Sequence, residues 1–385
     1  MYKKNKIAAL ALVTALAATS LSACGASKDA ALVKIDGNKD KISYGYAAFT
    51  AYYTQAMYEL LYGQSTNLDT MWSTDYSGEG KDMEVQVKDQ LLDSMKEEYF
   101  LAKHATDYKV KITDEEEKKI KETAKAFLDA NSDEGIKKLG ASQEYVEKML
   151  RDETIRRRMK KAIEAEADST VTAEEANQKS YSYVKWDTGI KQTEDGSGFA
   201  PVSDDEKAEF KAQAEKLSQA ADFEAAAGEM NLTITNGHFG QSELKDAKAD
   251  SEKKEGEASS YTGNPYELLS AVDALAEGQI SQVIETKDAI YVAKLTSLKD
   301  EEATATEMET LEQKKKDDHY KEVLDAYEAE STWVVDEKLW DKVEFIDHFK
   351  GTLYDTDTGN EETTEESSEH AAEEFRLRNK SWNSM

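Results

Sequence analysis

The chain has 385 residues, and its 79 acidic side chains outnumber its 49 lysines and arginines, which gives a formal net charge of -30 at pH 7. A surface with this charge repels polyanions, so the composition argues against nucleic acid as a partner. A single cysteine excludes both a disulfide framework and a metal site built from several cysteines. The five histidines show no metal-ligand spacing and no nucleotide-binding motif is present, so we expect neither a metal nor another cofactor.

Residues 1–23 have the pattern of a secretory signal peptide. Three lysines within the first six residues precede an apolar run over residues 7–18, and small residues follow that run. The run is too short to be a membrane-spanning helix. The pattern therefore places the rest of the chain outside the cytoplasmic membrane.

The sole cysteine, Cys24, directly follows Leu-Ser-Ala. This tetrad resembles the bacterial lipobox, which implies cleavage before Cys24 and attachment of a two-chain lipid to its sulfur; two acyl chains suffice for stable anchoring. Residues 24–30 are then a short tether, and the loss of three lysines takes the net charge from -30 to -33. The alternative is an ordinary signal peptide with an incidental cysteine.

Residues 31–175 have a mainly helical pattern. Alternation over residues 31–36 predicts a strand, Gly37 and Asn38 predict a turn, and Ser43 predicts the N-cap of a helix that ends near Gly63. Three pairs with the spacing of a capping box predict further helix starts along the chain. These pairs are Thr113 with Glu116, Thr172 with Glu175, and Ser203 with Glu206.

The helix after Ser43 is unusually rich in aromatic residues. Its rings are Tyr44, Tyr46, Phe49, Tyr52, Tyr53, Tyr58 and Tyr62. Seven rings cannot all point into one narrow helical stripe, so we expect some of them to face a groove or the surface, where tyrosine suits promiscuous binding. We take Tyr46, Phe49 and Tyr53 as candidates for contact with a bound polypeptide. The alternative is that these rings pack the core.

Residues 176–299 change to a mixed pattern. An alternating segment at 181–186 predicts a strand, a polar connector over 187–202 follows, and helices are expected from Ser203 and from Asp222. Residues 236–240 predict a turn, and the charged segment 241–262 predicts a flexible insertion. A helix after Pro265 and strands at 283–284 and 290–295 complete a small sheet.

Residues 300–350 return to a helical pattern. Thr304 with Glu307 predicts the start of a long helix through Ala329, and residues 333–345, with two tryptophans, predict a short docked strand or helix. The acidic composition of residues 351–385 predicts a disordered tail.

One stretch resembles the end of a parvulin-type prolyl isomerase (rotamase) domain. It consists of Gly278-Gln279-Ile280-Ser281, Thr286 and the segment from Ala289 to Leu295. Together with the lipobox and the order of the segments, it makes the chain similar to the PrsA and SurA class of extracytoplasmic foldases. The resemblance implies an α+β fold with a mainly helical chaperone body, built from residues 31–175 and 300–350, and an inserted parvulin-like domain at 176–299.

The sequence departs from the parvulin pattern where that family carries its histidines. The first strand reads Tyr181-Ser182-Tyr183-Val184, and the final strand carries Tyr291 at the matching position. The resemblance therefore makes Tyr181, Tyr183, His238, Phe239 and Tyr291 the candidates for a pocket, with phenols in place of imidazoles. No residue is assigned a catalytic role.

These patterns favour a lipid-anchored chaperone or foldase on the extracytoplasmic face of the cell membrane, with a degenerate isomerase-like domain. It would hold unfolded or partly folded exported polypeptides without ATP, because no nucleotide motif exists. One alternative is an active parvulin-type peptidyl-prolyl isomerase, and a second is a surface lipoprotein that binds a small solute. A homo-oligomer remains open.

Overall fold

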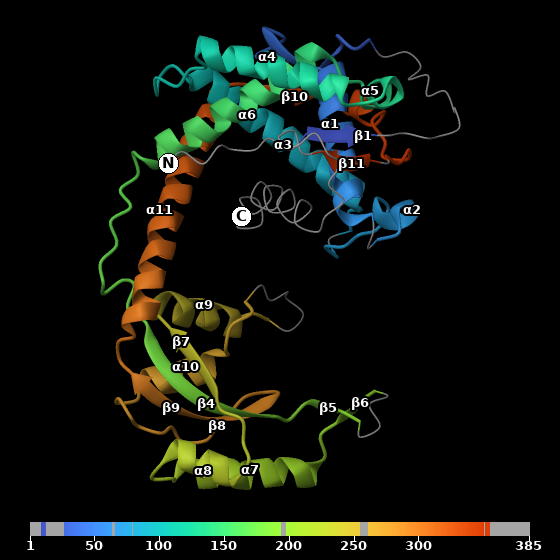
Figure 1. Cartoon of the computed structure of the whole chain (residues 1–385). Helices are drawn as coiled ribbons and strands as arrows, with labels where there is room; N and C mark the ends of the chain where they lie inside the picture. Colours follow the sequence, from blue (N-terminus) through green and yellow to red (C-terminus); the bar gives the residue numbers. More distant parts are fainter. Residues whose placement is uncertain are drawn as a thin grey trace. The chain divides into compact units, whose positions relative to one another are not determined.

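The computed structural model describes residues 9–12, 27–63, 66–78, 80–193, 198–254, 261–349 and 351–354. The predicted lipidation site Cys24 and residues 355–385 of the predicted disordered tail lie outside these residues, whereas residues 351–354 of that tail form a strand. The chain divides into two compact units, which we call the helical unit (Met1–Glu166 with His319–Met385) and the sheet unit (Ala167–Asp318). Helices dominate both units, and each also contains a small antiparallel sheet, so the fold class is α+β (Figure 1). None of the helices in the described residues has the length and apolarity needed to span a bilayer.

The helices of the helical unit lie on both sides of the sheet unit in the sequence. They are α1 (Tyr44–Tyr62), α2 (Leu68–Met71), α3 (Met83–His104), α4 (Asp114–Asp129), α5 (Asp133–Leu139), α6 (Gln143–Glu164), the second part of α11 (Glu301–Ala329) and α12 (Glu337–Trp340). Ser43 caps α1 through its side chain, and the predicted capping box of Thr113 and Glu116 opens α4. Both starts were predicted correctly, because a cap depends only on neighbouring residues.

A three-stranded antiparallel sheet joins the N-terminal and C-terminal chain segments of the helical unit. Its strands are β2 (Ala31–Ile35), β3 (Asp40–Ser43) and β10 (Trp333–Val335), in the order β10-β2-β3. The turn between β2 and β3 uses positive φ angles at Asp36, Gly37 and Asn38, a conformation that Gly and Asn adopt at low cost. Because β10 lies about 300 positions after β2 in the chain and pairs with it directly, the C-terminal segment is part of this unit.

A further strand pair links residues near the two ends of the chain. Strand β1 (Ala9–Leu12), inside the segment predicted as a signal peptide, pairs antiparallel with β11 (Gly351–Tyr354). The predicted cleavage before Cys24 would remove β1 from the mature chain.

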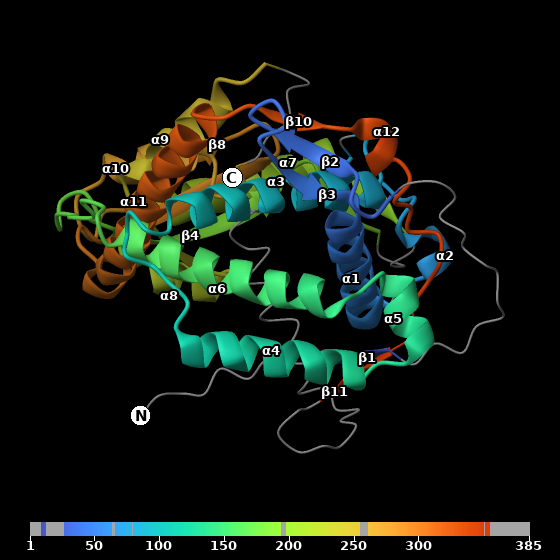
Figure 2. The same ribbon diagram turned by 90° about the horizontal axis from the view of Figure 1, so that it is seen from above.

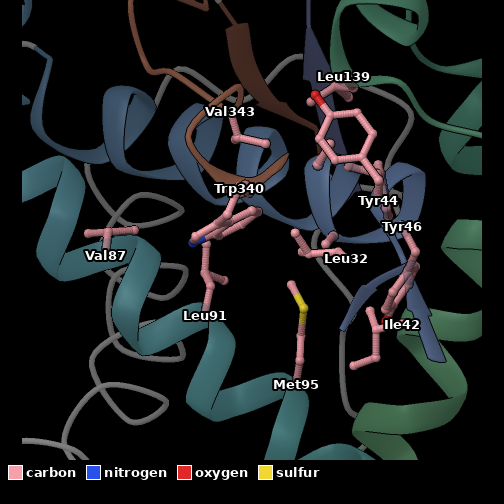
Figure 3. Packing of buried hydrophobic residues seen from close by; sticks show 14 of the residues in the cluster. Leu32, Ile42, Tyr44, Tyr46, Val87, Leu91, Met95, Leu139, Trp340 and Val343 are labelled. Carbon is pink, nitrogen blue, oxygen red and sulfur yellow. The ribbon is translucent and has the colours of Figure 1, made fainter. Parts of the chain in front are cut away.

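The core of the helical unit combines side chains from both chain segments. Figure 3 shows Trp340, from the C-terminal segment, between Val343 of the same segment and Leu91 of α3; Leu32 of β2 and Met95 of α3 belong to the same cluster. All five are buried, with Val343 and Leu32 at 0% exposure. Each large apolar side chain buried in this way contributes about 1.5–3 kcal/mol, which fixes the C-terminal segment to the N-terminal helices.

Helices α4 and α6 run side by side, and α6 also packs against α3 (Figure 2). The basic residues of α6 are paired with acids: Arg151 with Glu117, and Arg158 with Glu116. The pKa of Glu116 is lowered to about 2, chiefly by its hydrogen bond from Arg158. These arginines therefore tie two helices together.

The sheet unit is built on a four-stranded antiparallel sheet in the order β7-β4-β9-β8. The strands are β4 (Lys179–Asp187), β7 (Thr235–Phe239), β8 (Ile284–Glu285) and β9 (Ala289–Ser297), with a separate hairpin of β5 (Ile190–Gln192) and β6 (Phe199–Pro201). The helices are α7 (Asp204–Ser218), α8 (Phe223–Glu229), α9 (Gln241–Ser251), α10 (Tyr266–Asp273) and the first part of α11. Helices α7 and α8 cover one face of the sheet, and α9 and α10 cover the other (Figure 1).

Several predicted elements of the sheet unit are wrong. The segment predicted as a turn at 236–240 lies mostly in strand β7. The segment predicted as an insertion at 241–262 contains helix α9, whose Leu244 and Ala247 pack into the core between the sheet and helices α9 and α10. The connector at 187–202 contains the β5–β6 hairpin. In each case contacts with distant parts of the chain, which local composition does not reveal, decide the outcome.

Two predicted helix starts also differ from the structure. Thr172 and Glu175 form the hydrogen bonds of a capping box, but only a turn follows them, because the backbone of Gln178 is bonded to Thr304 Oγ1 and to the Asp300 N–H. Helix α11 begins at Glu301, before the predicted start at Thr304. The Thr304 hydroxyl accepts a hydrogen bond from the N–H of Gln178, the residue before β4, instead of acting as a cap.

Candidate functional site

Four of the five predicted pocket residues lie on one face of the four-stranded sheet. Tyr181 and Tyr183 come from β4, Phe239 from β7 and Tyr291 from β9. The ring centroid of Tyr181 lies 5.7 Å from that of Tyr183 and 5.6 Å from that of Phe239. The ring centroids of Tyr183 and Tyr291 are 6.0 Å apart. We call these four residues the aromatic cluster.

The aromatic cluster is packed beneath α9 and α10. Tyr181 is 1% exposed, Phe239 is fully buried, Tyr291 is 5% exposed and Tyr183 is half-buried. Burial is the main cause that raises the pKa of both Tyr181 and Tyr291. Their phenols are therefore neutral at physiological pH and act as hydrogen-bonding groups, not as nucleophiles.

The Tyr181 hydroxyl already has a partner within the unit. Asn264 Nδ2 donates to Tyr181 Oη at 2.7 Å, and the Asn264 carbonyl accepts from Tyr261 Oη at 2.9 Å. Tyr261 also contacts the carboxylate of Glu243, whose pKa is raised mainly by burial. This chain of polar groups fixes the ring of Tyr181 in the core.

His238 does not belong to the aromatic cluster. In the β4–β7 ladder it pairs with Ser180, and Gly237 pairs with Tyr181, so the side chain of His238 points to the opposite face from the ring of Tyr181. The prediction that His238 and the four rings share one pocket is therefore corrected. Its imidazole is exposed, as is usual for histidine at a sheet edge.

A hollow of about 380 Å³ lies at His238. It is lined by Ser180, Tyr181, Ser182, Asn236, Gly237, His238, Thr296 and Asp300. The Ser180 hydroxyl donates to Asp300, and Ser182 Oγ donates to Asn236 Oδ1 at 2.7 Å. The pKa of Asp300 is lowered, first by the hydrogen bond from Ser180. Ser180 is bonded to a carboxylate whose lowered pKa makes it a weak base, so this pair is poorly suited to activate the hydroxyl as a nucleophile.

Phe239 lines a different hollow of about 440 Å³, together with Lys179, Gln241 and Asp273. There Lys179 Nζ binds Asp273 Oδ1 at 2.9 Å. The predicted pocket residues are thus distributed over a packed cluster and two separate hollows. In the described residues, no group of three or more His, Cys, Asp or Glu side chains is arranged to hold a metal ion.

The Gly237 backbone lies directly against the ring of Tyr181. A Cβ atom at position 237 would come within 2.9 Å of both Cζ and Oη of Tyr181. Because this ring is buried and hydrogen-bonded, it cannot move aside freely. The absence of a side chain at Gly237 is therefore required for the packing of β7 against the aromatic cluster.

We predict that Gly237→Ala lowers the free energy of unfolding of the sheet unit by about 1–3 kcal/mol, the usual cost of overpacking a core. Urea unfolding followed through the fluorescence of Trp186, which lies in this unit, measures the change. Gly228→Ala is the matched control, because no atom lies within 4 Å of a Cβ placed there. An unchanged midpoint for Gly237→Ala would show that the ring of Tyr181 is not held in place.

The predicted client-binding residues of α1 are mainly core residues. Tyr46 is 3% exposed and Phe49 is fully buried, and both rings contact Tyr145 of α6. Tyr53 is half-buried against Phe127 of α4. This corrects the prediction for Tyr46 and Phe49, which cannot touch a bound chain while the unit is folded. A helix surrounded by α3, α5, α6 and the C-terminal segment buries more than one stripe.

A buried carboxylate on α1, that of Glu59, was not among the predicted site residues. The side chain of Glu59 is completely buried and accepts hydrogen bonds from Gln55 and Trp72, and its other contacts are to the C-terminal segment at His348 and Phe349. A lone acidic residue within the apolar run Ala56-Met57-Tyr58-Glu59-Leu60-Leu61 was the available signal. Buried charges are rare unless they are paired and hydrogen-bonded.

No family model and no curated protein matches the sequence. Among solved structures, the chain is similar to the foldase protein PrsA of Lactococcus lactis, at 12% identity and a TM-score of 0.30 over 82% of this chain and 99% of that one. It is similar to the peptidylprolyl isomerase PrsA of Bacillus cereus, at 17% identity and a TM-score of 0.25 over 82% and 98% of the two chains. A third structure, of the SurA-like chaperones PEB4 and Cj1289 of Campylobacter jejuni, matches at 10% identity and a TM-score of 0.25 over 80% and 99%. These three solved structures are of PrsA proteins and of SurA-like chaperones.

Proposed function

We propose that this protein is a lipid-anchored extracytoplasmic chaperone or foldase that holds exported, incompletely folded polypeptides without ATP. One observation carries the proposal: a sheet unit with the parvulin-like stretch is inserted into a helical unit whose two chain segments pair through β2 and β10. This is the segment order that the sequence resemblance implies.

The parvulin-like stretch supports the proposal through its place in the sheet. Gly278 has a φ of +82°, and its N–H donates to the Leu295 carbonyl, while Ile280 bridges to Lys294 and the Ser281 N–H donates to the Ala293 carbonyl. Residues 278–281 therefore run antiparallel beside the end of β9, in the connection from α10 to β8. A glycine suits this backbone conformation because it has no Cβ.

Exposed apolar side chains offer contacts for a client. The β5–β6 hairpin presents Ile190 at 64% exposure and Phe199 at 73%. Large apolar groups exposed near each other mark surfaces that bind other polypeptides. The strong negative charge of the chain favours basic or neutral clients over acidic ones.

Light scattering by a chemically denatured test protein, diluted into buffer without ATP, tests the holding function. We expect the full chain to suppress aggregation, and Ile190→Ser with Phe199→Ser to weaken suppression about threefold or more, as expected when two apolar anchors are removed. Gln192→Ser is the matched control, since Gln192 is exposed on the same hairpin. Unsuppressed aggregation with the unaltered chain would remove the basis for the chaperone proposal.

The proposed anchor is tested separately through Cys24. We expect the chain made in a bacterium to incorporate a labelled fatty acid and to sediment with membranes, and Cys24→Ser to do neither. If the unaltered chain takes up no label, the anchor is to be dropped, and the holding function is unaffected.

Prolyl isomerisation is the second candidate, because Tyr291 stands where the parvulin family carries a histidine and lies beside Tyr183. Burial of Tyr181 and the separation of His238 favour a degenerate domain. We therefore expect a protease-coupled assay on a proline peptide to show turnover close to the uncatalysed rate. Fast turnover that is lost on Tyr291→Ala would contradict this and favour the enzyme.

A further inference from the structure

Residues 343–349 lie along α1, α3 and α5 as an extended segment outside any helix or strand. Val343, Phe345 and Phe349 are 0%, 2% and 4% exposed, whereas Ile346 is 64% exposed. The ring of Phe345 meets Trp72 edge-on, with centroids 4.6 Å apart. The segment therefore inserts three apolar side chains, leaves Glu344 and Ile346 exposed, and keeps Asp347 and His348 half-buried.

The backbone of this segment is held by side chains of the helical unit. Two carbonyl groups accept from lysines, one carbonyl accepts from an amide, and two N–H groups donate to carboxylates. The contacts are Lys88 Nζ to Val343 O at 2.7 Å, Lys138 Nζ to His348 O at 2.5 Å, Gln55 Nε2 to Asp347 O at 3.0 Å, Phe345 N to Glu84 Oε2 at 3.0 Å and Phe349 N to Glu59 Oε2 at 2.5 Å.

Lys138 and Glu59 close the end of this groove at Phe349. Lys138 Nζ lies 4.3 Å from the centroid of the Phe349 ring, and burial lowers the pKa of this lysine. Glu59 Oε1 accepts from Trp72 Nε1 and lies 2.9 Å from His348 Nδ1. Both charges face the extended segment, where they are worth more than they would be in water.

Contacts of this kind recognise a polypeptide through its backbone groups and through the spacing of a few apolar residues. The backbone groups are the same in every chain, and the alternation of Val343 and Phe345 with outward residues is that of any extended segment. Pairing with a strand would fix the register of the bound segment through a ladder of backbone hydrogen bonds. The five side-chain contacts and three apolar sites seen here constrain only a few positions of the bound segment. This is what a site for many different unfolded clients requires.

We propose that the groove formed by α1, α3 and α5 is a client-binding site that the chain's own residues 343–349 occupy, and that an extended client segment with apolar residues at the spacing of Val343, Phe345 and Phe349 displaces them. The inference deepens the proposed function and rests on it. Occupation from within the chain lowers the apparent affinity for a client, by the fraction of molecules in which the groove is open. It also keeps the apolar sites covered when no client is present.

The test uses a labelled, end-capped peptide with the sequence Val-Glu-Phe-Ile-Asp-His-Phe and fluorescence anisotropy with the full chain. Phe349→Ala weakens the internal occupant, so we expect this variant to bind the peptide at least about tenfold more tightly than the unaltered chain. Ile346→Ala is the matched control on the same segment and should bind like the unaltered chain. A peptide with both phenylalanines replaced by serine should bind none of them. Equal or weaker binding by Phe349→Ala overturns the inference.

A second measurement needs no variant and decides the matter if Phe349→Ala does not fold. Excess peptide should accelerate deuterium exchange at the amides of Phe345 and Phe349 in the unaltered chain, with no change in α4. Unchanged exchange at these two amides overturns the inference. If the chain suppresses aggregation but the peptide does not accelerate exchange at these amides, the groove is not the client-binding site, and the proposed function stands. If the peptide displaces the segment but the chain does not suppress aggregation, the proposed function is contradicted.

Discussion

Replacing Glu59 by alanine should lower the free energy of unfolding of the helical unit by about 3–5 kcal/mol, the range found when one partner of a buried charged pair is removed. The carboxylate is completely buried, and its loss leaves the Trp72 Nε1–H and the Phe349 N–H without their acceptor. Each buried donor left unpaired costs about 1–3 kcal/mol. The C-terminal segment should then separate from α1 before the rest of the unit unfolds.

Urea unfolding followed by tryptophan fluorescence measures this change, because Trp72 and Trp340 both lie in the core of the helical unit. Asp69→Ala is the matched control: its side chain is 86% exposed, although it lies 3.6 Å from the other ring nitrogen of His348. The control should change stability by no more than about 0.5 kcal/mol. An equally small change for Glu59→Ala would mean that the C-terminal segment does not depend on this carboxylate.

Phe49→Ala should also cost about 3–5 kcal/mol, because it leaves a cavity where a fully buried ring had packed. The ring lies 6.1 Å from that of Tyr145 and 6.2 Å from that of Tyr53, measured between centroids. The substitution removes a ring contact between α1 and α6, because Tyr145 lies on α6, and a second ring contact within α1 at Tyr53. The expected effect is on stability and not on client contact.

Measuring both the stability and the aggregation suppression of Phe49→Ala distinguishes a role in the core from a role in client binding. Below its unfolding temperature, Phe49→Ala should suppress aggregation as well as the unaltered chain does. Tyr76→Ala, at a position that is 60% exposed, should leave stability within about 0.5 kcal/mol. A stable Phe49→Ala variant that no longer holds client would instead restore the sequence-based assignment of this residue to the client surface.

Features set by neighbouring residues were predicted well. The N-cap at Ser43 and the capping boxes at Thr113 and Ser203 depend on side chains within three positions, and the structure contains all of them. The same logic placed a box at Thr172, and its hydrogen bonds form. No helix follows because Gln178 is bonded to residues more than 120 positions away. Such long-range bonds lie beyond local sequence patterns.

The candidate site shows the same limit. The period of a strand correctly placed Tyr181 and Tyr183 on one face. Whether His238 joined them depended on the register of β7 against β4, which pairs His238 with Ser180 and turns it to the other face. A shift of one residue would have reversed this result. Likewise, Tyr46 and Phe49 were assigned from ring density alone, whereas their burial follows from the packing of α6 on α1.

The groove that holds residues 343–349 could not be predicted from either of its parts. Glu59 and the segment around Phe349 are separated by 290 positions, and each of the five backbone contacts joins a helix to a segment far along the chain. The lone glutamate in an apolar run indicated a buried charge without naming its partner. Its partners in the C-terminal segment are His348 and the N–H of Phe349, which only the fold brings against α1.

The function we propose for this protein is to help exported polypeptides to fold outside the membrane. It is tested by comparing exported proteins from cells with and without the protein, by quantitative mass spectrometry together with limited proteolysis. We expect a subset of exported proteins to fall in abundance or to become protease-sensitive in its absence, and the unaltered chain to restore them. Exported proteins that are unchanged in both abundance and folding would contradict the chaperone account.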